Sequence, residues 1–434
     1  MIIIYLKQAW ALLKQNKLFS ALYIIGTGLA IGTTMIMAMV YYVKIAPAYP
    51  EVNRMHTYYL TSAQFEMGDN FDSTVSGSVS YNAVQEWFYP LKNVEAVSAR
   101  LVTFESMNSY IQPTDGSGDI KVSLMLTDPA FFRIYAFQFL EGKSFTDADL
   151  ESGLCTAVIT DDVARRVFGT VEGVVGRSFS LNYVDYRVCG VVRQASYLMS
   201  NSYSQVYVPY STASSYRALW YDELPYVGSY DLTFLVKDGE QADALRAEVQ
   251  DIVRRENLIH AKEWKLEIWD QPTSHTDSVF QEYADDKFDV WAKVRQALLV
   301  LLVLLLVPAL NLSGMIASRM EGRLPEMGVR KSFGAGRGTL LSQVMWENLL
   351  LTLLGGALGL VLAWLVLGVG REWVFGIFDS AQGSVPAGAV AYVPGESLFA
   401  PLVFLAALVL CVLLNMLSAL VPAWHSLRNP IVNS

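Results

Sequence analysis

Four long, mainly apolar runs constrain the fold of this 434-residue chain more than any other feature. They cover residues 18–43, 294–318, 340–370 and 397–424. A helix of about 20 apolar residues crosses the roughly 30 Å of hydrocarbon in a bilayer, and each run is long enough to do so. Only 17% of the residues are charged, whereas a typical soluble domain has about 25%. The sequence therefore predicts a membrane protein with four transmembrane α-helices.

The distribution of Lys and Arg indicates the orientation of these helices. Residues 1–17 contain three lysines and no acid, and they suit either an amphipathic helix on the membrane surface or a simple basic flank of the first span. The 319–339 segment holds five Lys or Arg residues, whereas the 371–396 connection holds one. Because cytoplasmic loops are enriched in Lys and Arg, we expect residues 1–17, 319–339 and the tail 425–434 in the cytoplasm. Residues 44–293 and 371–396 then lie outside.

The first connection, residues 44–293, is predicted to be a large α+β domain with two lobes. It contains 35 Asp or Glu against 21 Lys or Arg, and such an acidic surface argues against nucleic acid as a partner. The middle portion, 126–228, is predicted to be inserted in the outer lobe, and residues 281–293 to extend the second span as a stalk. Hydrophobic periodicity predicts strands at 97–104, 122–126, 157–160, 178–181, 186–192, 206–208 and 232–236, and helices at 83–91 and 241–257.

The segment between the second and third runs has the pattern of a short surface helix. Pro325 suits the first helical position, and Glu326 faces the positive end of the helix. Arg330 and Lys331 fall in the last turn, and Gly334 suits the left-handed residue that ends a helix. Glu326 and Arg330 are also four residues apart, in the order that favours pairing. We therefore expect a helix of about two to three turns here, available to a partner protein.

Two of the predicted spans carry small residues at a spacing typical of helix contacts. Gly28 and Gly32 lie in the first span, and Gly355 and Gly359 lie in the third. Glycines four residues apart allow helices to approach closely. We expect both pairs to serve helix packing, within one subunit or between two, rather than a substrate path.

The sequence predicts no catalytic, cofactor-binding or metal-binding residue. Gly142-Lys143-Ser144 resembles the end of a nucleotide-binding loop, but Phe137 stands where that loop needs a glycine. The four histidines show no metal-ligand spacing. Glu347 is the only acid within reach of the membrane, and an interfacial partner such as Arg337 explains it better than an ion path; the spans otherwise lack the ionisable residues that an ion-coupled carrier uses. We therefore expect a chain that is not an enzyme and that depends on an energy source in another subunit.

Two features leave alternatives open. Cys155 and Cys189 both lie in the predicted external domain, where a disulfide can form, but each also suits an ordinary strand position. Residues 197–230 contain eight tyrosines and Trp220. Such residues favour either a recognition surface or positions in the core and in strands.

Several passages resemble one family of membrane proteins. Residues 8–16 (QAWALLKQN) lead into a span with spaced glycines, and residues 139–149 (FLEGKSFTDAD) and 157–169 (AVITDDVARRVFG) follow in the external domain. Residues 326–335 (EMGVRKSFGA) precede a Gly-rich span. The chain is thereby similar to permeases of the MacB/FtsX type, the membrane subunits of mechanotransmitting ABC transporters. The similar passages are the family's first helix, its periplasmic core domain and its cytoplasmic coupling segment.

The resemblance implies a permease in the bacterial inner membrane that pairs with a second permease copy or paralogue. Two separate cytoplasmic ABC ATPases would hold ATP and Mg²⁺, and their motion would reach the external domains through stalks and drive efflux or extraction of a substrate. The resemblance is compatible with a periplasmic adaptor as a further partner and does not decide whether one is involved. The residues expected to contact or support the ATPase are Arg319, Glu326, Gly328, Arg330, Lys331, Gly334 and Arg337.

Two other functions fit the same sequence. The first is an FtsX-like regulator or sensor, which uses the same machinery to act on an external partner without transport. The second is a membrane-anchored receptor that works without an ATPase.

Overall fold

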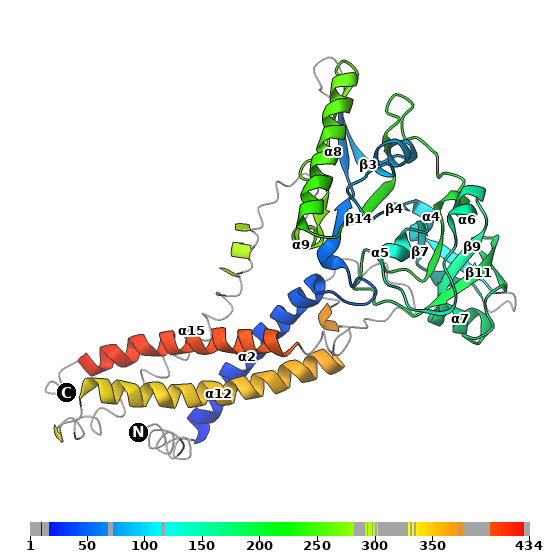
Figure 1. Cartoon of the computed structure of the whole chain (residues 1–434). Helices are drawn as coiled ribbons and strands as arrows, with labels where there is room; N and C mark the ends of the chain where they lie inside the picture. The colour runs from blue at the N-terminus through cyan, green and yellow to red at the C-terminus, as the bar shows by residue number, and fades with distance from the viewer. Residues whose placement is uncertain are drawn as a thin grey trace. The chain divides into compact units, whose positions relative to one another are not determined.

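The structure is a computed structural model of the chain. It describes residues 10, 17–67, 73–113, 118–281, 336–370, 373–375 and 400–428, and isolated positions between 291 and 333. The chain divides into two compact units, which we call the helical unit and the domain unit (Figure 1). The helical unit comprises residues 1–43, 291–378 and 395–434, and the domain unit comprises residues 44–290 and 379–394.

The domain unit is an α+β domain built on one mixed sheet. In the described residues, 16 strands form this sheet, and its main path runs β15-β2-β3-β14-β4-β7-β12-β9-β11-β10-β5-β6. The strands are β1 (Thr57–Leu60), β2 (Ala63–Met67), β3 (Ser73–Val79), β4 (Ala96–Leu101), β5 (Ser109–Gln112), β6 (Ile120–Val122), β7 (Leu124–Thr127), β8 (Phe139–Gly142), β9 (Thr156–Thr160), β10 (Ser178–Leu181), β11 (Val184–Val192), β12 (Val206–Pro209), β13 (Val227–Gly228), β14 (Tyr230–Leu235), β15 (Trp264–Glu267) and β16 (Thr273–Ser274).

Helices of the domain unit cover this sheet and connect its strands. Helix α8 packs on β15, and its first turn is capped by Asp238, whose side chain accepts a hydrogen bond from Gln241 N. Ser274 caps α9 in the same way, through Asp277 N. The helices are η1 (Arg54–His56), α3 (Tyr81–Ala83), η2 (Val84–Phe88), α4 (Phe104–Met107), α5 (Phe131–Ile134), α6 (Asp147–Ser152), α7 (Asp161–Phe168), η3 (Tyr210–Thr212), α8 (Gly239–Ile259) and α9 (His275–Phe280).

Different parts of the chain build the two halves of the sheet. Strands between residues 57 and 101 and between 227 and 274 form the first half, and strands between 109 and 209 form the second. The halves join where β4 pairs antiparallel with β7, with Arg100 opposite Thr127. The second half therefore begins before the predicted insertion at 126–228, because β5 and β6 also belong to it.

The strands and helices expected from periodicity are confirmed by β4, β7, β9 to β12 and β14 and by η2 and α8. Strand β4 is shorter than the predicted 97–104, because Phe104 begins α4. The stalk predicted at 281–293 stays a prediction. Helix α9 ends at Phe280, Gln281 is extended, and residues 282–290 lie outside the described residues.

The helical unit contains three described helices that are long and apolar enough to cross a membrane. They are α2 (Lys17–Ile45), α12 (Arg337–Val369) and α15 (Pro401–Arg428), of which Ser20–Ile45, Leu341–Val369 and Pro401–Leu420 have the required composition. The predicted span at 294–318 falls almost entirely on residues outside the described ones. Three of the four predicted spans are therefore found among the described residues, and the fourth stays a prediction.

Glycines bring α2 and α12 into close contact in the helical unit. A Cβ atom on Gly359 would lie 2.6 Å from Gly28 O and 3.0 Å from Gly32 N, which is closer than real Cβ contacts allow. A Cβ on Gly28 would lie 3.1 Å from Gly355 O. The four glycines singled out in the sequence thus face one another across one helix pair, and the two backbones touch where side chains are absent.

Polar side chains also link these helices. Tyr23 Oη donates a hydrogen bond to Asn348 Oδ1, which joins α2 to α12. Asn348 Nδ2 lies 3.4 Å from the carbonyl oxygen of Asn415 on α15. In a bilayer such hydrogen bonds between helices add to van der Waals packing, because lipid offers no polar partner.

The Gly359 contact leads to a test with a matched control on the same helix. Gly359→Ala should lower the stability of the full chain by about 1–3 kcal/mol, because the added methyl group meets backbone atoms of α2. Gly368→Ala should keep or slightly raise stability, because among the described residues no atom beyond its own stretch of helix lies within 4 Å of its added Cβ, and Ala favours helix. Unfolding by sodium dodecyl sulfate in mixed micelles measures both variants. An equal effect of the two substitutions would contradict the close contact.

Candidate functional site

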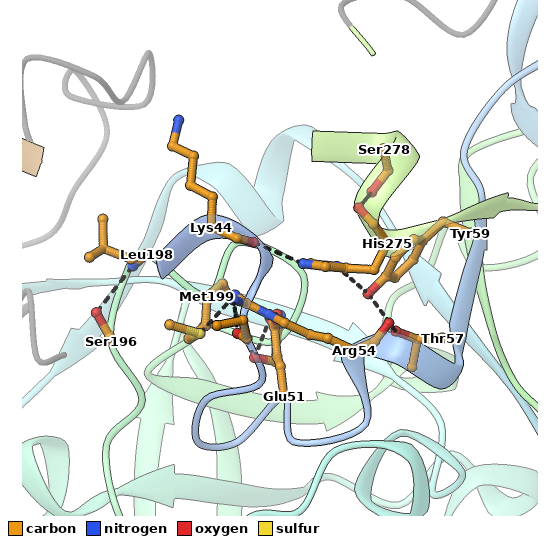
Figure 2. Close-up of polar contacts among 12 residues, drawn as sticks. Lys44, Glu51, Arg54, Thr57, Tyr59, Ser196, Leu198, Met199, His275 and Ser278 are labelled. Carbon is orange, nitrogen blue, oxygen red and sulfur yellow. Dashed lines mark hydrogen bonds and ion pairs between the residues drawn. The ribbon is translucent and has the colours of Figure 1, made fainter. Parts of the chain in front are cut away.

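The candidate functional site lies where the chain enters the domain unit from α2 and where α9 begins. Helix α2 ends at Ile45, and its last two residues already belong to the domain unit. Polar side chains from η1, β1 and α9 converge on this end of α2 (Figure 2). We call these residues the junction cluster; its members are Lys44, Glu51, Arg54, Thr57, Tyr59, Met199, Ser202 and His275.

An ion pair between Glu51 and Arg54 forms the centre of the junction cluster. Arg54 Nε donates to Glu51 Oε2 at 2.8 Å, and the two side chains are only 2% and 1% exposed. A second guanidinium nitrogen donates to Ala46 O at 2.7 Å, immediately after α2. The third lies 2.9 Å from Met199 Sδ. Each nitrogen of the buried guanidinium thus has a partner, as burial of a charge requires.

The other carboxylate oxygen of Glu51 reaches the second half of the sheet. Glu51 Oε1 accepts hydrogen bonds from Ser202 N at 3.0 Å and from Ser202 Oγ at 2.7 Å. Nearby, Asn53 Nδ2 donates to Ile134 O at 3.0 Å, and Tyr49 Oη donates to Arg193 O at 2.8 Å. The segment that follows α2 is therefore bonded to the inserted half of the domain as well as to its own half.

His275, the first residue of α9, bonds to the last turn of α2. Its Nε2 lies 3.0 Å from Lys44 O, and its Nδ1 lies 3.2 Å from Tyr59 Oη (Figure 2). A carbonyl oxygen only accepts, so we assign the proton to Nε2 and let Nδ1 accept from the Tyr59 hydroxyl. Burial lowers the pKa of His275, Arg54 acts in the same direction and Glu51 opposes it. Burial also raises the pKa of Tyr59, which keeps that phenol a donor.

The residues predicted to form the coupling segment fall mostly outside the described residues. These are Arg319, Glu326, Gly328, Arg330, Lys331 and Gly334. Arg337 is the first residue of α12, and its side chain is not described. Within the segment, Phe333 N donates to Val329 O at 3.2 Å, which is one turn of helix, and both side chains are exposed.

Other features of the sequence resolve into structural roles. Gly142 pairs with Gly190 of β11 at the end of β8 and has a φ of +68°, so it ends a strand at a tight contact. Cys155 and Cys189 are free thiols, and burial raises the pKa of Cys189 to about 12. Tyr207 and Tyr230 of the tyrosine-rich segment are fully buried core residues. In the part of the chain that the structure describes, no cluster of His, Cys, Asp or Glu suits a metal ion.

Sequence reasoning missed the junction cluster. Glu51 and Arg54 are three residues apart just after an apolar run, which is a weak signal of a local pair. His275 had been noted only for its lack of metal-ligand spacing. Nothing in its neighbourhood indicates Lys44 as its partner, because 231 residues separate the two.

The lowered pKa of His275 predicts a pH effect on stability. The unfolded chain binds the proton more readily than the folded chain, so this stabilisation is complete above about pH 6.5 and decreases as the pH falls below it. His275→Gln should therefore flatten the dependence of the melting temperature on pH below about 6.5. His56→Gln, at an exposed histidine, should keep the wild-type profile. Identical profiles for wild type and His275→Gln would contradict this role.

Curated relatives of the chain include ABC transporter permeases. Macrolide export ATP-binding/permease protein MacB of Shewanella oneidensis is 26% identical over 281 residues, which are 64% of this chain and 40% of that protein. The uncharacterized ABC transporter permease YknZ of Bacillus subtilis is 22% identical over 310 residues, 71% of each chain. The chain therefore spans less than half of the length of the MacB relative.

Solved structures similar to the chain are domains of the same kind of protein. The extracellular domain of the noncanonic ABC-type transporter YknZ from Gram-positive bacteria aligns with 48% of this chain and 99% of that domain, at 15% identity and a TM-score of 0.34. The periplasmic region of MacB from Actinobacillus actinomycetemcomitans aligns with 48% and 87%, at 14% identity and a TM-score of 0.32.

Two family models match the chain and account for most of its length. Residues 20–252 match the MacB-like periplasmic core domain, and residues 298–431 match the FtsX-like permease C-terminal region. The first model alone covers more than half of the chain. The resemblance seen in the sequence is thus confirmed: this chain belongs to the MacB/FtsX family of ABC transporter permeases.

Proposed function

We propose that this chain couples ATP hydrolysis in a separate cytoplasmic ATPase to motion of its α+β domain on the outer side of the inner membrane. Two such permeases, identical or paralogous, would work together and drive efflux or extraction of a substrate. The observation that carries the proposal is the hydrogen-bonded junction between the end of α2 and the start of α9. A domain that is moved by its membrane helices needs a stiff connection at this place.

The junction cluster meets this need through burial. Glu51 and Arg54 are shielded from water, and breaking a buried ion pair by loss of one partner costs about 3–5 kcal/mol. His275 adds the bond to Lys44 O, so that α9 and the end of α2 are held to each other. A displacement of α2 would then be passed to β1, to α9 and to Ser202 in the second half of the sheet, instead of being absorbed in a loose linker.

The 319–339 segment is the proposed contact for the ATPase. Val329 and Phe333 lie one helical turn apart and are 57% and 87% exposed, which leaves two apolar side chains available to a partner. Arg319, Arg330, Lys331 and Arg337 would surround them with positive charge. Exposed apolar groups within a charged rim are the usual composition of a protein interface.

The composition of the helices favours an energy source in another subunit over coupling to an ion gradient. In α12 the only acidic residue is Glu347, and in the described spans the basic residues lie near the helix ends. Ion-coupled carriers generally place several ionisable groups along their path. The close glycine contact between α2 and α12 also suits a packed helix pair more than a substrate passage. These features support transport work done by the domain, outside the bilayer.

Membrane topology is tested by accessibility of single cysteines. In a background with Cys155, Cys189 and Cys411 replaced by Ser, Ser215→Cys should react with an impermeant maleimide in intact spheroplasts. Gly322→Cys should react only after the membrane is permeabilised, because the Lys and Arg distribution places it in the cytoplasm. Labelling of Gly322→Cys in intact spheroplasts would reverse the proposed orientation.

Charge reversal at Arg330 tests the coupling role. Arg330→Glu should reduce co-purification of the ATPase and the activity of the complex at least about tenfold, if the contact loses a charge pair of the usual strength. Folding should survive, because an exposed helix pair with Glu326 contributes only about 0.2–0.5 kcal/mol. Arg371→Glu, in the connection expected outside, is the matched control and should behave as wild type. Normal ATPase recovery and activity with Arg330→Glu would refute the coupling role.

A further inference from the structure

A cavity in the domain unit lies apart from the junction cluster and from the coupling segment. Its volume is about 520 Å³, within the roughly 300–1,000 Å³ of small-molecule sites. One wall comes from α3, η2 and the residues up to β4, and the other comes from the loop after β7, α6 and η3. Both halves of the domain therefore line this cavity.

Four hydrogen bonds in the cavity wall converge on Asp128. This carboxylate is 2% exposed and accepts from Ser98 Oγ and Ala99 N, each at 2.8 Å, and from Phe131 N at 3.1 Å. Tyr89 Oη also donates to it at 2.7 Å. These donors are all neutral, so the carboxyl group receives hydrogen bonds but no opposite charge from them. Burial raises the pKa of Asp128, and the four hydrogen bonds act against that rise.

The direction of these hydrogen bonds leaves two phenol oxygens in the cavity wall as hydrogen-bond acceptors. Tyr89 uses its single hydroxyl proton on Asp128, so in its 3.3 Å contact with Tyr210 the Tyr210 hydroxyl must be the donor. Both hydroxyl protons are then engaged, and both phenol oxygens keep lone pairs that can accept a hydrogen bond. Burial raises the pKa of Tyr89, so the phenol stays protonated and this order holds at neutral pH. A ligand that forms hydrogen bonds with these two phenol oxygens must bring its own donors.

Aromatic faces form another part of the wall, and one cation already rests on them. The Arg217 guanidinium lies 5.3 Å from the ring centre of Tyr81 and 4.9 Å from that of Tyr216. Both distances are in the range of cation–π attraction. The arrangement therefore accepts a planar cation against its rings, and the exposed Arg217 side chain occupies that place in this structure.

Acidic residues outnumber basic ones around the cavity. Its charged lining residues are Glu95, Asp128, Asp147 and Glu151 against Arg133 and Arg217. Walls that carry an excess of one sign in a partly enclosed space raise the local concentration of the opposite ion.

We propose that this cavity binds a small organic cation. An ammonium, amidinium or guanidinium group would donate to the phenol oxygens of Tyr89 and Tyr210 near the buried Asp128, and the apolar body of the ligand would lie against the tyrosine rings. Binding would bridge the two halves of the domain, since both contribute walls. The site is independent of the proposed coupling to an ATPase.

Three ligands of equal shape and different charge test the site: benzamidine, benzamide and benzoate. Titration calorimetry is done on the full chain in lipid nanodiscs, with empty nanodiscs subtracted. Benzamidine should bind saturably, benzamide should bind at least about tenfold more weakly, and benzoate should not bind measurably. The reason is that hydrogen bonds from a charged group are stronger than those from a neutral one. No saturable binding of benzamidine, equal affinity for benzamide, or preference for benzoate would each overturn the proposal.

Variants then place the binding in this cavity. Tyr210→Phe should weaken benzamidine binding about tenfold through loss of one acceptor, and thermal unfolding verifies that the variant is folded. Arg217→Gln should strengthen it roughly two- to fivefold, because the competing cation leaves the rings. Glu172→Gln, at an exposed acid outside the cavity, is the control and should bind as wild type. An unchanged affinity in Tyr210→Phe, or a weaker one in Arg217→Gln, would refute the site.

Discussion

The buried ion pair between Glu51 and Arg54 is the interaction on which the organisation of the domain unit depends. Neither charge reaches water, so both must be satisfied by the protein, and the partners come from two parts of the chain, residues 46–54 and residues 199–202. Arg54 holds the backbone directly after α2, and Glu51 holds Ser202 in the inserted half. Loss of a partner leaves a buried charge unpaired, which is energetically costly. The end of α2 is therefore held in a fixed position relative to both halves of the domain.

The helical unit relies on a different constraint. Lipid is as apolar as the side chains of the spans, so burial of apolar surface does not by itself select one helix pairing. Contact of the backbones at Gly28 and Gly359 supplies that selection through close packing. The bond from Tyr23 to Asn348 adds a polar contact with few alternatives in a bilayer. This permease thus combines a helix pair held by close packing with a domain held by a buried ion pair.

Much of the local structure could be predicted from residue patterns. Strands such as β9 and β12 are short apolar runs, and α8 has an amphipathic period and an Asp cap, so each is encoded within its own segment. Strand β3 (STVSGSV) was missed because its small polar residues carry no period-two signal. The tyrosine-rich segment could be read as surface or core, and only the packing around Tyr207 and Tyr230 assigned them to the core.

The lengths of the apolar runs, the acidic character of the domain and the family can be recognised from the residues alone, because these depend on composition and on neighbours a few residues apart. The contacts between distant residues depend on the folded chain. Glu51 and Ser202 are 151 residues apart, and Lys44 and His275 are 231 apart. Any of the many Ser residues or of the four His residues could form such a hydrogen bond, and a single sequence does not distinguish among them. The order of strands in the sheet brings one particular Ser and one particular His to the end of α2, and that order is a property of the folded chain.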